Sequence, residues 1–249
     1  MPANRARRRA LPALVVAVVL ASGLALAASL RPSAPGSTAA EPIPSASQGE
    51  TTGTRNQSQL RAPQLSLAGQ RWYDFYGVEL PFSAAGGPRH RSGGLAAGFA
   101  HSPLGALLAA VNVGVRANAQ WGRRIFAAVI REQITGPDAA ALLANCQAPY
   151  ARANQFAGVT GGRPLGRVDV AEEAFRWDAY TPAAAIIDLV SAGPGAQGAT
   201  VRASTQIQVV WDGRDWKVIA PPGGDWGNSA AELSSLTGYT AFPGQGGGR

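Results

Sequence analysis

The chain of 249 residues contains one cysteine and two histidines. Zinc sites need clusters of these residue types at set spacings, and neither HExxH nor CxxC occurs, so no metal site is expected. One cysteine also excludes an internal disulfide. Cys146 follows Leu142 and Leu143 at helical spacing, which favours a small buried core residue over a reactive thiol.

Signatures of nucleotide binding and of serine catalysis are absent too. The glycine-rich stretch 83–98, which contains His90, lacks GxxxxGK[ST], and no GxSxG surrounds Ser102. Adjacent side chains such as His101 and Ser102 generally point apart, so they are not expected to form a nucleophile and base. The sequence therefore predicts a protein that is not an enzyme and needs no cofactor.

Acidic residues are absent before Glu41, whereas Arg5, Arg7, Arg8 and Arg9 lie in the first ten positions. The formal charge of +7 is concentrated at this end, because 18 basic residues face 15 acidic ones after residue 30. A nucleic-acid-binding body is therefore not indicated. Residues 1–10 are expected to form a basic cytoplasmic tail.

Residues 11–30 are twenty residues without a charge, long enough as a helix to cross a hydrocarbon core of about 30 Å. Because the preceding arginines favour the cytoplasmic side, we expect a transmembrane anchor with the C-terminal domain outside the cell membrane. A cleavable signal peptide is the alternative, since Ala25-Leu26-Ala27 fits a cleavage site. The apolar run exceeds the usual length of such a peptide, which favours the anchor.

The chain after the anchor divides by composition. Residues 31–68, rich in Pro, Ser, Thr and Gly, are expected to form a disordered linker. Residues 69–243 are expected to form one extracytoplasmic domain, and 244–249 a flexible tail. Aromatics gather in 69–83, where an extended stretch packed over the core is favoured. In the alternative, Trp72 and Tyr73, with His101, contact a partner.

Helix signals follow. Ser102 is a favoured N-cap and Pro103 suits the first helical position. One face of this helix contains Leu104, Leu107, Leu108, Val111 and Val115. Further helices are predicted over about 120–133 and over about 137–150, the latter started by Thr135. The solvated face of the predicted helix 120–133 would contain Arg123-Arg124 and Arg131-Glu132. A role in solubility is favoured there over a partner site.

The last third has the alternating pattern of strands, over 174–180, 184–190 and 200–211, with a tight hairpin over 211–219 around Asp212-Gly213. Helices followed by an antiparallel meander predict an α+β domain, in which helices cover one face of a curved sheet.

The stretch "GFAHSPLGALLAAVN", with "YGVELPFSAAGGP" before it and "YTPAAAIIDLV" and "VVWDGRDWKVI" after it, resembles a family of anchored membrane proteins of high-GC Gram-positive bacteria that is linked to conjugative elements. The order of elements is also similar to the cone of the nuclear transport factor two-like domains found in conjugation and type IV secretion scaffold proteins. The resemblance implies other envelope or transfer-apparatus proteins as partners. The oligomeric state stays open, with a homo-oligomer as one alternative.

Three functions remain open. A membrane-anchored scaffold in DNA transfer or secretion is favoured. A small-ligand-binding or hydrolytic domain would use the hollow of the cone, with Glu172, Glu173, Asp178 or His101 as polar groups. Glu172 and Glu173 are expected on opposite faces of a strand, so they do not form a carboxylate pair. An envelope protein without a role in transfer is the third.

We expect the protein to stay in the membrane through residues 11–30. Cell fractionation followed by mass spectrometry of the N-terminus checks this. A soluble mature form that begins near Ala28 would contradict the anchor and favour the signal peptide.

Overall fold

The computed structural model describes residues 62–244. The basic tail 1–10, the anchor 11–30, most of the linker 31–68 and all but the first residue of the tail 244–249 lie outside this range. Among the described residues, no helix is both long and apolar enough to span a bilayer. Residues 62–68 contain no helix or strand, but Leu65 and Leu67 pack against the core, so the packed domain begins before residue 69.

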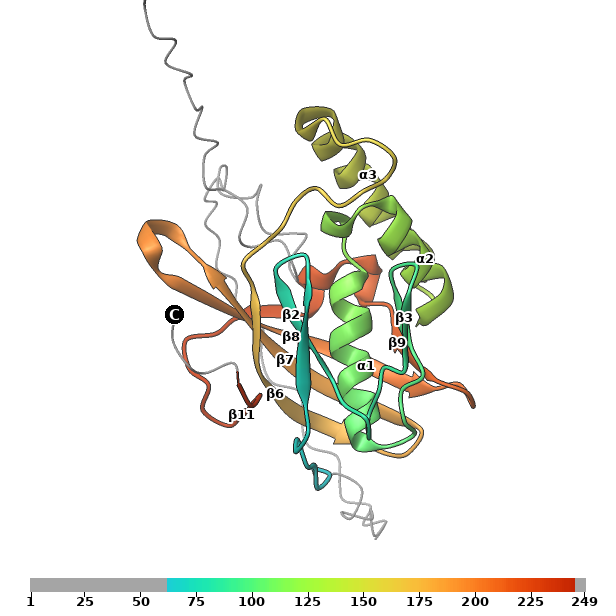
Figure 1. Cartoon of the computed structure of the whole chain (residues 1–249), viewed down its shortest axis with the longest axis vertical. Coiled ribbons are helices and arrows are strands. Elements are labelled where there is room, and N and C mark those ends of the chain that lie inside the picture. Colours follow the sequence, from blue (N-terminus) through green and yellow to red (C-terminus); the bar gives the residue numbers. More distant parts are fainter. Residues whose placement is uncertain (1–61, 245–249) are drawn as a thin grey trace, which may run out of the picture.

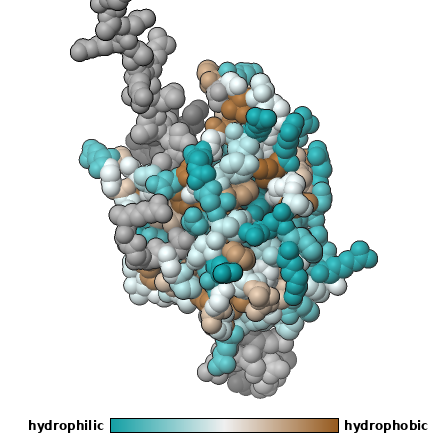
Figure 2. All heavy atoms as spheres, viewed as in Figure 1, coloured by the Kyte–Doolittle hydropathy of each residue, from teal (hydrophilic) through white to brown (hydrophobic). Residues whose placement is uncertain are grey.

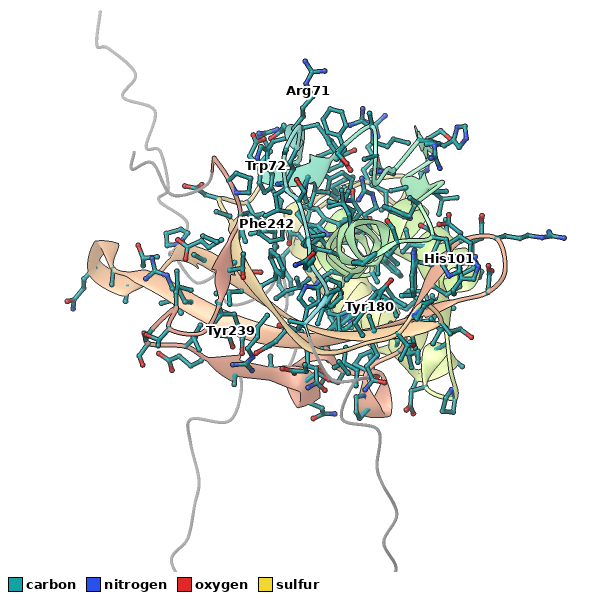
Figure 3. All side chains as sticks on the ribbon, turned by 90° about the horizontal axis from the view of Figure 1, so that it is seen from below. Arg71, Trp72, His101, Tyr180, Tyr239 and Phe242 are labelled. Atoms are coloured by element: carbon teal, nitrogen blue, oxygen red, sulfur yellow. The ribbon has the colours of Figure 1, made fainter. Side chains whose placement is uncertain are left out.

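The described chain is α+β, with helices and a mainly antiparallel sheet, which confirms the predicted class. Its α-helices are α1 (Pro103–Arg116), α2 (Arg123–Gln133) and α3 (Ala139–Ala157). Figures 1 and 3 show α1 lying on one side of the sheet, whose long strands curve beneath it.

The main sheet has the strand order β11-β6-β7-β8-β9-β5, and β10 pairs with the free part of β8. Its centre is made of three long antiparallel strands, and only β5 pairs in parallel, with β9. The strands are β5 (Ile134–Thr135), β6 (Ala171–Tyr180), β7 (Ala184–Pro194), β8 (Thr200–Trp211), β9 (Trp216–Ile219), β10 (Ala230–Glu232) and β11 (Thr240–Ala241).

Helix α1 is the centre of the core. Every residue from Leu104 to Arg116 is buried, as in helices that are apolar on all sides. The sheet covers one side. The other sides are covered by α2 and by two hairpins, β1 (Arg71–Phe75) with β2 (Val78–Phe82), and β3 (His90–Ser92) with β4 (Leu95–Ala97). The stretch 69–83 is therefore an extended hairpin packed over the core.

Two glycines let α1 approach its neighbours closely. A Cβ at Gly105 would lie 1.9 Å from the carbonyl oxygen of Ala100, and one at Gly114 would lie 2.6 Å from Cδ1 of Ile207 on β8. The first contact involves backbone, which cannot rotate away. These positions fix how α1 sits against the loop before it and against the sheet.

The start of α1 is a capped N-terminus. Ser102 has extended backbone angles, its Oγ accepts a hydrogen bond from the Gly105 N–H at 3.2 Å, and Pro103 follows in the first turn. The hydroxyl thus satisfies one of the N–H groups that have no partner inside the helix.

The other two helices differ from the predicted ranges. Gly122, with φ +80°, divides the predicted helix 120–133 into the 3-10 helix η2 (Ala119–Trp121) and α2. A Cβ at Gly122 would lie 2.2 Å from the Arg163 carbonyl oxygen, so the break is also a contact point. Thr135 belongs to β5, and α3 begins after Asp138 and continues through Pro149. It ends at Gly158, whose left-handed conformation is typical of a helix C-terminus.

The three predicted long strands are present, and β8 joins β9 through a turn over 212–215 in which Gly213 has φ +95°. The C-terminal strap, residues 230–243, was not anticipated. It pairs as β10 with β8, crosses to the other edge, and pairs as β11 with β6. Figure 3 shows Tyr239 on the sheet face away from α1, where its hydroxyl donates to Asp188.

We expect Ser102→Ala to lower the free energy of unfolding by about 1 kcal/mol, because one N–H at the start of α1 loses its acceptor. Ser102→Asp should stay near the original stability, since a carboxylate accepts the same bond. Chemical denaturation of the full chain measures both. Ser92→Ala, at an exposed serine of β3, is the control, and an equal loss there would contradict a specific capping role.

Candidate binding surface

A shallow hollow of about 520 Å³ lies between α2 and the loop after α3. We call it the α2 groove, and its lining residues are Arg123, Arg124, Ala127, Ala128, Arg131, Glu132, Gly161 and Gly162. Figure 2 shows hydrophilic side chains gathered over the helical part of the molecule. The groove thus combines four small residues with three cationic side chains and one acidic one, Glu132.

Helical spacing builds the groove. Ile125, Phe126, Val129 and Ile130 turn into the core, which leaves Arg123, Arg124 and Arg131 exposed on the opposite side of α2. The loop lies against the first turn because the Arg124 N–H donates to the Gly162 carbonyl at 3.1 Å. Gly162 has φ +70°, a conformation in which a side chain would be strained.

The arginines of the groove are electrostatically unsatisfied. Within residues 62–244, no carboxylate forms an ion pair with Arg123, Arg124 or Arg131. Glu132 accepts from Lys217 Nζ at 2.7 Å, but through its backbone carbonyl. Guanidinium groups bind carboxylates and phosphates through paired hydrogen bonds, so this surface suits an anionic ligand.

His101 and Ser102 have separate partners. The His101 ring stacks on Trp211 with a centroid distance of 4.2 Å, and its Nε2 lies 2.6 Å from the Pro182 carbonyl oxygen. Ser102 is occupied by the helix cap. His101 therefore links the start of α1 to the β6–β7 turn and to the end of β8.

Trp72 and Tyr73 are engaged within the domain. Trp72 Nε1 donates to the Pro243 carbonyl at 3.0 Å, and its ring contacts Phe242 edge-on at 5.8 Å. The Tyr73 hydroxyl donates to Asn112 Oδ1 and accepts from Arg116. Both aromatic residues thus hold the β1–β2 hairpin in place.

Arg116 is buried without a carboxylate partner in the described part of the chain, and only 2% of its surface is exposed. Its guanidinium donates to the backbone carbonyl and side chain of Asn112 and to Tyr73, and lies 4.4 Å from the Phe75 ring centroid. Burial lowers the pKa of Arg116, and the neighbouring Tyr73 opposes this. This network was not predicted from the sequence.

The carboxylates expected to serve a ligand site are dispersed. Glu173 pairs with Arg202 at 2.5 Å, and Asp178 lies 3.2 Å from Arg176. Glu172 is buried and accepts from Ser191 at 2.8 Å. Ser191 is opposite Ala203, the neighbour of Arg202, so Glu172 and Glu173 do face opposite sides of the sheet.

Burial raises the pKa of two side chains strongly. It raises the pKa of the Cys146 thiol to about 12, so this thiol is protonated and a poor nucleophile at neutral pH. It raises the pKa of the Glu172 carboxyl to about 7, although the Ser191 hydrogen bond acts in the opposite direction. Glu172 Oε1 has no hydrogen-bond partner in the described part of the chain.

Comparison with known protein families shows the family of the chain. Residues 33–241 match the family described as a domain of unknown function, DUF8175. The chain belongs to the DUF8175 family. No curated protein and no solved structure matches it. In this DUF8175 domain, the match includes every described helix and strand and ends with β11, two residues before the end of the strap.

Glu172 should make the stability of the DUF8175 domain depend on pH. Between its ordinary pKa of 4.5 and its folded pKa of about 7, the folded state keeps a proton that the unfolded state has lost. The stability from this group is therefore present below pH 4.5 and decreases as the pH rises to 7, by on the order of 3 kcal/mol.

Denaturation curves between pH 4.5 and 8 give the free energy of unfolding of the original full chain and of Glu172→Gln, whose amide oxygen can still accept the Ser191 hydrogen bond. The difference between these two free energies measures the effect. We expect the difference to change across this window, whereas Glu132→Gln, at an exposed position, should follow the original chain. Parallel profiles for the original chain and Glu172→Gln would contradict the assignment.

Proposed function

We propose that this DUF8175 protein is a non-enzymatic scaffold, anchored in the cell membrane by residues 11–30, whose extracytoplasmic domain binds other envelope proteins of a DNA-transfer or secretion apparatus. The observation that carries the proposal is the α2 groove, where three arginines have no carboxylate partner within residues 62–244. The matching ligand is an acidic segment of a partner protein.

The dimensions of the groove favour an extended peptide. Arg123 and Arg131 are eight positions apart on α2, which corresponds to about 12 Å at 1.5 Å per residue. An extended chain advances about 3.3 Å per residue, so acidic residues three or four positions apart reach both guanidinium groups. Ala127 and Ala128 between them leave room for the peptide backbone.

The sequence supports the remaining parts of the proposal. The uncharged run 11–30 behind an arginine cluster is suited to an anchor, and the polar linker after it gives the domain reach. The resemblance to anchored proteins linked to conjugative elements supports the role in transfer, and its cone-like architecture is proposed on the same resemblance. Scaffold domains of this kind need no catalytic residues.

The function is tested by placing a photo-crosslinking residue at Ala128 of the full chain and expressing this chain in the cells that naturally contain the protein. We expect capture of an envelope protein with an acidic segment, and loss of DNA transfer or secretion when the groove is reversed in charge by Arg123→Glu with Arg131→Glu. Mass spectrometry identifies the captured protein. Charge reversal should weaken binding because each oppositely charged pair across the interface contributes to the affinity.

The matched control is Arg71→Glu with Arg214→Glu, which changes the net charge equally at exposed arginines outside the groove. Capture and transfer should persist in this control. Capture of nucleic acid in place of protein, or capture that survives reversal of the groove, would contradict the proposal.

A further inference from the structure

A second surface, separate from the α2 groove, runs along α3. Phe156, near the end of this helix, is 91% exposed. Asn145, Pro149 and Arg152 precede it by eleven, seven and four positions, a spacing that places all four residues on one face. Figure 1 shows α3 at one end of the domain, away from the long strands of the sheet.

The same face contains a hollow of about 250 Å³, lined by Asn145, Ala148, Pro149, Arg152, Asp225 and Trp226 among others. A cavity of about 150 Å³ is sufficient to bind benzene, so the volume of this hollow is large enough for a phenyl ring. Hydrogen bonds fix two of the side chains that line the hollow. Asn145 Nδ2 donates to the carbonyls of Gly223 and Gly224 at 3.1 and 2.9 Å, and Trp226 Nε1 donates to the Ala117 carbonyl at 3.1 Å.

The charges at the rim of this hollow are complementary. Arg152 and Asp225 both line it, and within the described chain neither forms an ion pair. The Asp225 carboxylate accepts the Gly227 N–H at 2.9 Å, which leaves acceptor capacity. One surface thus presents a protruding aromatic ring, a hollow of suitable size, a cation and an anion.

We propose that this surface, Asn145 to Phe156 with the hollow beside it, binds a second copy of the chain in a two-fold dimer. In such an interface the same patch serves both copies, so each copy must contain both the protruding ring and the hollow that receives it. An antiparallel α3 pair that crosses at Arg152 places Phe156 of each copy opposite Ala148 of the other, at the hollow. Arg152 of one copy then lies beside both Arg152 and Asp225 of its partner, and the two Asp225 carboxylates balance the two guanidinium groups.

Sedimentation velocity of the full chain in detergent micelles, over a range of protein concentrations, tests the dimer. Phe156→Ser should raise the dimer dissociation constant about tenfold or more, because a buried aromatic anchor is lost. Arg152→Glu should raise it as well. Asp225→Asn keeps the acceptor for Gly227 but removes the charge, so we expect a smaller rise.

Two controls separate this surface from others. Val201→Ser removes another exposed apolar side chain, 42% exposed, and Arg124→Glu reverses a charge in the α2 groove, and both should leave the dimer intact. Thermal melting confirms that each variant is folded. A chain that stays monomeric at all concentrations, or a dimer that Phe156→Ser and Val201→Ser affect equally, would overturn the inference without bearing on the α2 groove.

Discussion

The complete burial of α1 determines most of the architecture. A helix of fourteen residues with no exposed side after its first turn must be covered in every direction, and no single sheet can do this. The curved sheet covers one side, while the two N-terminal hairpins and α2 cover the rest. Gly105 and Gly114 set the closest approaches, so α1 is held against both the preceding loop and β8.

Because α1 is buried on all sides, its polar side chains Asn112 and Arg116 lie in the core and need hydrogen-bond partners there. Unpaired polar groups in a core are costly, and a charged group more so. Tyr73 on β1 and the Pro81 carbonyl on β2 supply the partners, since Asn112 Nδ2 donates to Pro81 at 2.9 Å. The β1–β2 hairpin is thus needed to satisfy the helix as well as to cover it, which explains why Tyr73 faces α1.

Local signals in the sequence could predict the start of α1, because Ser102 and Pro103 act within one turn, and could predict the long strands from alternation. The full burial of α1 could not be predicted in this way, since Ala106, Ala109 and Ala110 fit an exposed face as well as a crowded one. The end of α3 depends on Gly158 and not on Pro149, which the helix accommodates. The α2 arginines were visible as a charged face, but the groove needs Gly161 and Gly162, which tertiary contacts alone bring to α2.

The distribution of ion pairs supports the proposed binding role of α2. Several carboxylates of the strands and their turns are paired within the domain, as Glu173 is with Arg202 and Asp74 with Arg167. The strap covers part of the sheet face away from α1, where Arg176 lies over the Tyr239 ring. Arg123, Arg131 and Arg152 on the helices have no such partners among the described residues. Helix α2 thus presents three arginines beside the single carboxylate of Glu132, and we expect their desolvation on binding to be best compensated by carboxylates from another chain.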